Sequence, residues 1–246
     1  MNDHLTLPTN QGFSRLFGSN KRGYLIGLLA VCGPFLIVAE IGAALGTDIS
    51  AASAVVIYLG YLLAIIVATV VLKAQGHSWR SLGLARPESW PKTIALALGL
   101  FLALVVALLA IKSIWINIPG LALPPSDQSD YNPLTGNLPL FLTMAVASFT
   151  VVAFGEEMLF RAFLINSLAG AFGNLKARWA IALVGSSLLF GLAHYDWGLT
   201  GIIEMFLAAL IIGAVYLRSG RNLWVVIIAH GLIDTLKFSL IYAGLV

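Results

Sequence analysis

The sequence predicts an all-α fold, a polytopic transmembrane helical bundle with seven to eight membrane-spanning helices. Of its 246 residues 59% are hydrophobic and only 10% are charged, and the mean hydropathy is +0.94. Soluble domains carry about 25% charged residues, so this chain has too few to cover a surface that faces water. Its apolar runs are continuous, which favours helices over the alternating segments of about ten residues found in membrane β-barrels. An ordinary soluble enzyme and a disordered chain are therefore excluded.

Seven apolar runs have about the length of 20 residues that crossing the hydrocarbon core requires. They are 24–45, 51–72, 93–111, 138 to about 172, 179–194, 199–217 and 223–245. The fourth run becomes two helices if the chain breaks at Gly155 or Gly170. Asn137 is typical of a helix start, because its side chain can accept from free amides and Pro139 is tolerated in the first turn. The segment 113–137 contains four prolines and is predicted to be an irregular loop.

The distribution of Lys and Arg predicts the orientation of the bundle. These residues gather before the first run and after the second, fourth and sixth runs, which places the N-terminus in the cytosol by the positive-inside rule. We expect residues 1–23 to form a cytosolic tail and residues 24–246 to form a single transmembrane domain. The net charge of +3 is small and fits this orientation, so no nucleic-acid partner is expected. We expect the lipid bilayer to surround the chain.

Three groups of polar residues interrupt the apolar runs of the second half. An ionisable side chain in a spanning helix costs about 2.5 to 3.5 kcal/mol, and it indicates a functional site unless it is otherwise explained. The groups are Glu156-Glu157 with Arg161, Phe190 with His194, and His230 with Asp234. Because unpaired charges are too costly in lipid, these side chains must pair with one another or face a wet cavity.

The spacing of these residues predicts how they pair. Glu157 and Arg161 lie one turn apart with the acid first, the favourable order for a helical ion pair. Glu156 lies about 100° around the helix, so it is expected to point elsewhere and stay free for chemistry. His230 and Asp234 share one helix face. Glu156 and His194 can lie at the same depth in the membrane only if the helix of the fourth run continues past Arg161.

Together the spacings predict that Glu156, His194, His230 and Asp234 converge on one buried polar cavity. A carboxylate in an apolar pocket can take a proton from water and return it to a leaving amine. A histidine beside it can orient the water or carry protons, and donors on the far side can stabilise an oxyanion. The set is therefore suited to amide hydrolysis.

Each group also has a simpler explanation when taken alone. Glu156-Glu157 could be an interfacial charge pair, His194 a packing residue, and His230 with Asp234 a local hydrogen bond; their joint occurrence favours a site. Two other acids, Glu40 and Glu204, lie near the outer ends of their runs and are expected to snorkel to the interface.

Other chemistries stay open. Glu156, His194, His230 and Asp234 are all competent zinc ligands, but the helical H-E-x-x-H signature is absent, so no metal site is predicted and zinc remains an alternative. A serine mechanism would use Ser186 or Ser187, which lack a glycine-bracketed elbow. The single cysteine, Cys32, excludes a disulfide framework and a cysteine-cluster metal site. A proton-coupled transporter would also use buried carboxylates, but no inverted repeat is visible.

The three groups resemble the motifs E-E-x-x-x-R, F-x-x-x-H and H-x-x-x-N of the CPBP family. These are the CAAX-processing and bacteriocin-processing intramembrane proteases, also called the Abi family, and the resemblance covers the motif-bearing core, about residues 138–240. It implies that Glu156 and His194 activate water, with Glu157 and Arg161 completing the first motif, and that His230 and Asp234 form the oxyanion side. Asp234 replaces the family's asparagine. An ionised aspartate donates no hydrogen bond, so it must be protonated, orient His230 or hold a metal.

From this resemblance we expect an intramembrane endopeptidase, a hydrolase that cleaves membrane-embedded or lipid-anchored peptides without a cofactor. A zinc-dependent version of the same protease is an alternative. Some relatives act as immunity or regulatory proteins, so a catalytically silent membrane partner is another. The expected location is a bacterial inner membrane, which the chain crosses several times.

Overall fold

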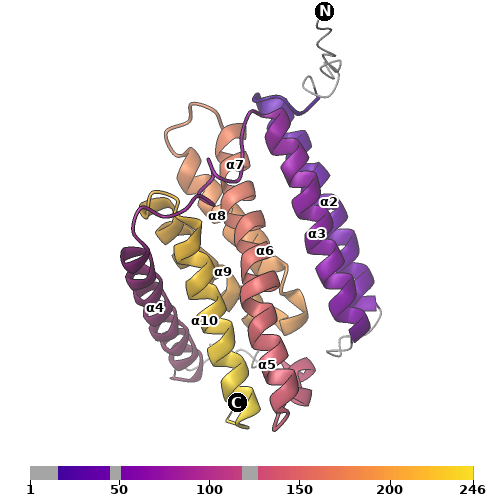
Figure 1. Cartoon of the computed structure of the whole chain (residues 1–246), viewed down its shortest axis with the longest axis vertical. Helices are drawn as coiled ribbons and strands as arrows, with labels where there is room; N and C mark the ends of the chain where they lie inside the picture. The colour runs from indigo at the N-terminus through magenta and orange to yellow at the C-terminus, as the bar shows by residue number, and fades with distance from the viewer. Residues whose placement is uncertain (1–15, 45–50, 118–126, 246) are drawn as a thin grey trace, which may run out of the picture.

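The computed structural model describes residues 16–44, 51–117 and 127–245, and all regular elements within these ranges are helical. Residues 1–15 of the predicted tail lie outside the described residues. The main helices are α2 (Lys21–Ala44), α3 (Ala51–Ala74), α4 (Trp90–Asn117), a composite helix over 138–171, α8 (Arg178–Leu192), α9 (Gly198–Arg218) and α10 (Leu223–Tyr242). The predicted all-α class is therefore confirmed (Figure 1).

The composite helix carries the first polar motif and runs without a break from Leu138 to Ala171. It consists of α5 (Leu138–Ala147), the π-helical η2 (Ser148–Val152), α6 (Ala153–Glu156), the π-helical η3 (Glu157–Leu164) and α7 (Ile165–Ala171). The predicted start is confirmed, because the Asn137 side chain accepts from the amide of Leu140 at 3.2 Å. The helix continues past Arg161 as predicted and does not break at Gly155. The two π-helical segments were not predicted; such segments often lie at functional sites.

Four helices among the described residues are long and apolar enough to cross a membrane. They are Trp90–Trp115, Leu138–Ala171, Tyr195–Arg218 and Leu223–Tyr242. The predicted count of seven to eight spans is thus not confirmed. Helix α8 has only 15 residues, fewer than the about 20 that a full crossing requires.

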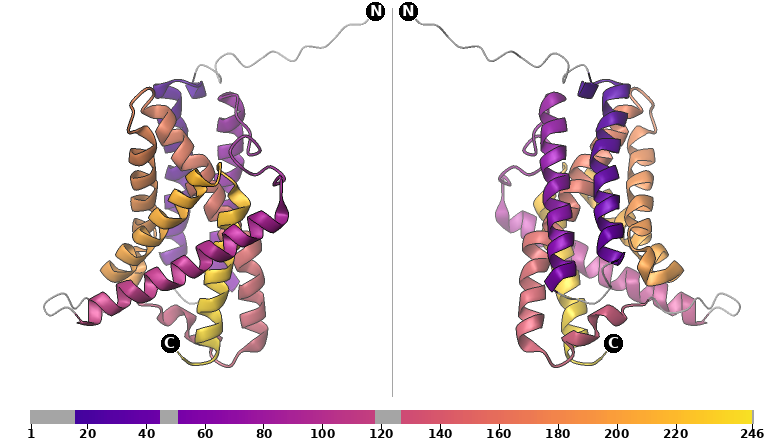
Figure 2. Two further views of the ribbon diagram at one scale, coloured as in Figure 1. Left: turned by 90° about the vertical axis from the view of Figure 1, so that its left-hand side faces the viewer. Right: turned by 90° about the vertical axis from the view of Figure 1, so that its right-hand side faces the viewer.

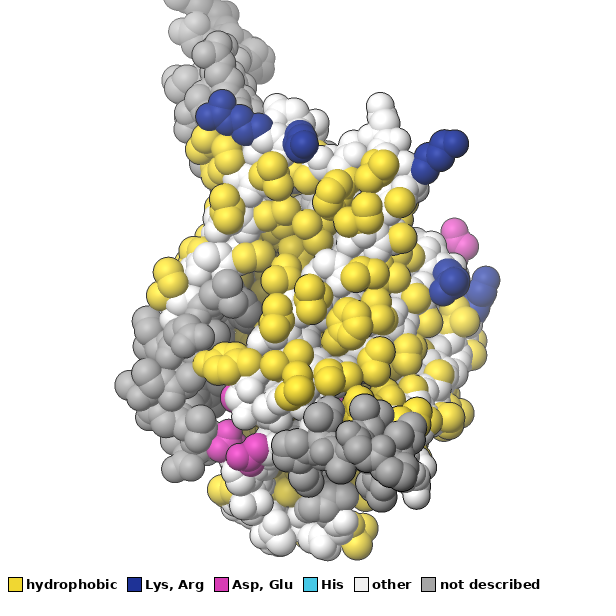
Figure 3. Space-filling model, turned by 180° about the vertical axis from the view of Figure 1, so that it is seen from behind, with side chains coloured by type: hydrophobic (Ala, Val, Ile, Leu, Met, Phe, Trp, Pro, Cys, Tyr) yellow, Lys and Arg dark blue, Asp and Glu magenta, His cyan; other side chains and the backbone are white. Residues whose placement is uncertain are grey.

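The helices pack in contacting pairs around the composite helix. On one side α2 contacts α3 and α7, and on the other α10 contacts α4, α5 and η2 (Figure 1). Helices α8 and α9 form a contacting pair, and α4 crosses the bundle obliquely (Figure 2). The face in Figure 3 is covered mainly by hydrophobic side chains, and the Lys and Arg visible there lie in the upper half of the view. This arrangement places α3, the composite helix and α10 next to one another.

A turn after α3 fixes the start of α10. The amide of Leu223 donates to the carbonyl of Gly83 at 3.1 Å, and the Tyr216 hydroxyl donates to the carbonyl of Leu82 at 2.7 Å. Gly83 has a φ of +106°, and a side chain there would collide with the carbonyl oxygen of Arg221. Glycine is therefore required where this turn approaches the first residue of α10, the helix that carries His230.

The loop predicted over 113–137 is more regular than expected. Helix α4 continues to Asn117 instead of ending at Ile111, and a 3₁₀ helix, η1, covers Ser129–Leu134. Residues 118–126 lie outside the described residues. A second 3₁₀ helix, η4 (Tyr195–Trp197), follows α8. The two short helices lie against each other through the rings of Tyr131 and Trp197, whose centroids are 6.3 Å apart.

Candidate functional site

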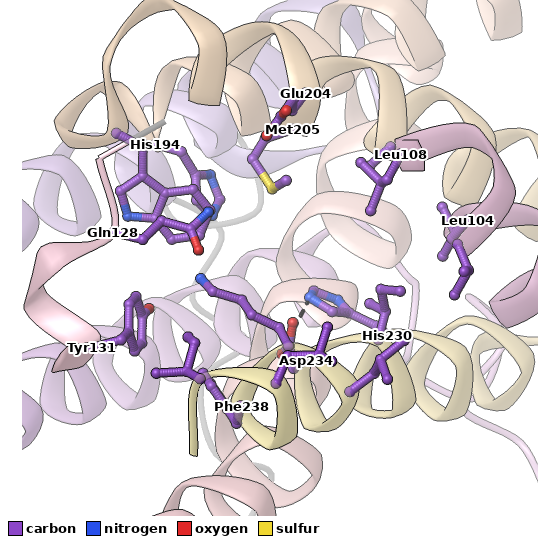
Figure 4. Close-up of a pocket in the computed structure, with 18 of the residues that line it drawn as sticks. Leu104, Leu108, Gln128, Tyr131, His194, Glu204, Met205, His230, Asp234 and Phe238 are labelled. Carbon is purple, nitrogen blue, oxygen red and sulfur yellow. Dashed lines mark ion pairs between the residues drawn. The ribbon is translucent and has the colours of Figure 1, made fainter. Parts of the chain in front are cut away.

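A cavity of about 680 Å³ lies between α4, α9, α10 and the composite helix. Much of its wall is apolar, with Leu, Ile, Val, Met and Phe side chains from these helices. The polar side chains on its wall include Glu156, His194, His230 and Asp234, the four residues predicted to converge. Figure 4 shows three of them, with the imidazole of His230 beside Asp234 and His194 across the cavity. The structure thus brings the predicted set together, while their catalytic roles stay predictions.

His230 connects the two glutamates. Its Nδ1 lies 2.7 Å from Glu157 Oε1, and its Nε2 lies 3.6 Å from Glu156 Oε2. The shorter contact is a hydrogen bond, so Nδ1 carries a proton; the longer one is beyond hydrogen-bond distance and within ion-pair distance. Glu156 was expected to point away from Glu157. Instead both carboxylates face the same imidazole ring, one at each nitrogen.

Glu157 and Arg161 form the ion pair that their spacing predicts. Arg161 Nη1 lies 3.0 Å from Glu157 Oε1, and both side chains are fully buried. The guanidinium carbon also lies 4.5 Å from the centroid of the Phe190 ring, a cation–π contact. Arg161 therefore holds Glu157, and Glu157 in turn holds His230.

Asp234 lies one turn after His230 on the same face of α10, as predicted. Its Oδ2 accepts a hydrogen bond from the Ser148 hydroxyl at 2.8 Å and lies 3.7 Å from His230 Nε2. Ser148 is the first residue of the π-helical segment η2. Two carboxylates, Glu156 and Asp234, therefore flank the same imidazole nitrogen.

His194 lies on the opposite wall, just after the end of α8. Its Nδ1 is 2.8 Å from the carbonyl oxygen of Phe190, and its ring centroid is 4.8 Å from those of Phe190 and Trp197. A carbonyl only accepts hydrogen bonds, so the proton of a neutral ring is assigned to Nδ1 and Nε2 keeps its lone pair. The spacing between Phe190 and His194 thus fixes both the position and the tautomer of the imidazole.

Tyr61 on α3 is a site residue that the sequence analysis missed. Its hydroxyl donates to Glu156 Oε1 at 2.6 Å, and its side chain is buried. A tyrosine in an apolar helix is unremarkable, and no motif in the first half of the chain marks this one. Ser148 was also missed, because it belongs to none of the three motifs.

The expectation for Glu204 is wrong. It was expected to snorkel to the membrane surface, but it is only 3% exposed and lines the cavity. The η1 and η4 segments contribute Tyr131, Asn132 and Trp197 to the wall of the same cavity, and sequence spacing alone does not reveal such a cavity. The side chain of Glu40, the other acid expected to snorkel, lies outside the described residues.

Among the side chains that the structure describes, no group of three or more His, Cys, Asp and Glu residues has the arrangement of a metal site. His230 and Glu157 use one nitrogen and one oxygen in a direct hydrogen bond. A zinc ion held by His230 Nε2 with Glu156 and Asp234 would need these ligands to draw together around it. Zinc dependence therefore stays an open alternative.

Residues 138–236 match the family model described as type II CAAX prenyl endopeptidase Rce1-like. This region contains all three polar motifs, and the match confirms the resemblance to the CPBP family of CAAX proteases. Comparisons with curated proteins and with solved structures gave no significant match. The match and the apolar helices place the protein in a membrane.

Proposed function

Because residues 138–236 are Rce1-like, we propose that this protein is a CAAX-type intramembrane endopeptidase that cleaves membrane-embedded or lipid-anchored peptides with water activated by Glu156 and His194. The observation that carries the proposal is the position of Glu156, His194 and His230 around one largely apolar cavity. An apolar wall can receive a peptide that is itself embedded in lipid. A carboxylate and two imidazoles are the groups that activate water and return its proton to a leaving amine.

In this proposal Glu156 is the general base. Tyr61 donates to Oε1 and holds the carboxylate, and Oε2 faces the cavity near His230 Nε2. A water molecule between Glu156 and His194 can give its proton to the carboxylate and attack the peptide carbonyl. His194 Nε2 accepts a hydrogen bond from this water, because Nδ1 is committed to the carbonyl of Phe190.

The oxyanion side of the proposal rests on His230. A protonated His230 donates from Nδ1 to Glu157 and from Nε2 into the cavity, where the oxyanion of the tetrahedral intermediate forms. Asp234 is anchored by Ser148 and lies beside Nε2, so it can orient the imidazolium. Of the three roles considered for Asp234, this geometry favours orientation of His230.

The membrane placement is part of the proposal. We propose a bacterial inner membrane, crossed seven to eight times, with the N-terminus in the cytosol. The positions of Lys and Arg along the sequence support this orientation.

A cleavage assay tests the proposed function. Purified protein in lipid nanodiscs should cleave a lipid-anchored peptide, detected by mass spectrometry of the products. We expect His194→Ala to lower kcat about 100-fold, because it removes an acid-base group, and His77→Ala, which lies outside the cavity, to keep full activity.

Three outcomes of this assay decide between the alternatives. Full activity of the His194→Ala variant would contradict the water-activating role of His194. Loss of activity with a chelator, restored by zinc, would favour the zinc-dependent version. If the wild-type protein cleaves no lipid-anchored or membrane-embedded peptide, the chain is instead a catalytically silent membrane protein.

The contact from Tyr61 gives a second prediction. We expect Tyr61→Phe to lower kcat about tenfold with little change in KM, because a hydrogen bond to a charged group contributes about 1.5 to 3 kcal/mol and here it positions the base. Tyr58→Phe on the same helix is the matched control and should leave kcat unchanged. A Tyr61→Phe variant that changes only KM would instead place Tyr61 in substrate binding.

A further inference from the structure

Lys237 is a cation in the cavity wall that the proposed mechanism does not use. It lies on α10 two turns after His230, about 10 Å farther along the helix axis. Its Nζ lies 4.0 Å from the ring centroid of Tyr131 in η1 and 4.0 Å from that of Trp197 in η4. Two aromatic faces therefore hold the ammonium group at one end of the cavity.

The ammonium group of Lys237 has hydrogen-bond donors that no described residue accepts from. Within the described part of the chain it makes no hydrogen bond to a side chain or carbonyl, and no carboxylate lies within ion-pair distance. Asp234, the nearest acid on the same helix face, instead accepts from Ser148 and flanks His230. An ammonium carries three donors, and a cation withdrawn from water is costly unless it is paired. The aromatic rings offset part of this cost and leave the charge unneutralised.

The cavity around Lys237 is mixed in charge. Lys112 lines the same cavity, as do Glu204 and Asp234. An anion entering this end therefore meets two lysines as well as three acids, because Asp196 of η4 also lies close enough to act on the Lys237 charge. The position of the ammonium between its rings decides where the anion lies. A carboxylate is the suitable partner, because a charge-assisted hydrogen bond from an ammonium is about twice as strong as a neutral one.

We propose that Lys237, held between Tyr131 and Trp197, is an anion subsite that binds the terminal carboxylate of the peptide substrate. The assignment rests on the proposed function, since it takes the occupant of the cavity to be a peptide. A peptide lying along α10 would place its cleaved bond near His230 and its carboxylate near Lys237. A phospholipid headgroup offers the same anionic chemistry, and the experiment separates the two sources.

A binding experiment in an uncleaving background tests the subsite. All variants carry Glu156→Gln, and fluorescence anisotropy measures binding of one lipid-anchored peptide made with either a free carboxylate or a carboxamide end, in phosphatidylcholine nanodiscs. We expect the carboxylate peptide to bind about tenfold more tightly. Lys237→Met and Lys237→Gln should abolish this preference, whereas Lys237→Arg and the matched exposed control Lys92→Met should keep it.

The outcomes distinguish this inference from the proposed function. Equal binding of the two peptides by the parent, or an undiminished preference in a correctly folded Lys237→Met or Lys237→Gln variant, overturns the subsite. The same measurement with the carboxamide peptide in phosphatidylglycerol nanodiscs tests the headgroup as the source of the anion. If Lys237→Met changes only the result in these nanodiscs, the occupant is a headgroup and the peptide assignment is wrong. If the wild-type protein cleaves no peptide but the Glu156→Gln parent still prefers the carboxylate peptide, the subsite is supported. Only the proposed protease function is then contradicted.

Discussion

Replacing Glu156 by glutamine should lower kcat for peptide cleavage by about 10²- to 10⁴-fold, the range expected for loss of a general base. Glutamine has nearly the same shape and can still accept from the Tyr61 hydroxyl, so the cavity keeps its form. What it loses is the ability to take a proton from water. The measurement is kcat on the lipid-anchored peptide, with thermal unfolding in detergent as the test of folding.

The cavity offers a matched control for this variant. Glu204→Gln removes another buried carboxylate from the same cavity wall and should lower kcat by less than tenfold. If Glu156→Gln keeps most of the wild-type activity, Glu156 is not the base. If both variants lose activity equally, the effect comes from the charge of the cavity and not from one proton acceptor.

The sequence was sufficient for the parts of the site that depend on local spacing. Glu157 with Arg161, and His230 with Asp234, each lie one turn apart, and a helix brings such residues together wherever it packs. The continuation of the composite helix past Arg161 was predicted from depth, since a shorter helix would separate Glu156 from His194. Both kinds of argument need only the rise and the period of a helix.

The remaining features depend on packing between helices, which spacing does not determine. Tyr61 contacts Glu156 because α3 packs beside the composite helix, and nothing local to Tyr61 indicates this. The burial of Glu204 likewise depends on how the helices pack around the cavity that it lines. The π-helical segment η3 also changes the rotation between neighbouring residues, which helps to explain why Glu156 and Glu157 reach the same ring.

Replacing Arg161 by methionine should lower the free energy of unfolding by about 3 to 5 kcal/mol, the cost of leaving a buried charge without its partner. Glu157 is fully buried, and without Arg161 its neutralisation depends on His230 alone. Nη1 and Nη2 of Arg161 also have no well-aligned hydrogen bond among the described residues, so the pair is held by charge and by the Phe190 ring. Reversible unfolding of the purified protein in detergent micelles measures the effect.

The double variant separates charge from shape. Glu157→Gln with Arg161→Met removes both charges, and replacing a complete buried pair is often neutral, so the double variant should be more stable than Arg161→Met alone. It should still lose activity, because glutamine holds His230 Nδ1 without the negative charge that favours an imidazolium. A double variant no more stable than Arg161→Met would mean that Arg161 stabilises the fold through packing against Phe190. The view that Arg161 stabilises the fold by neutralising Glu157 would then be wrong.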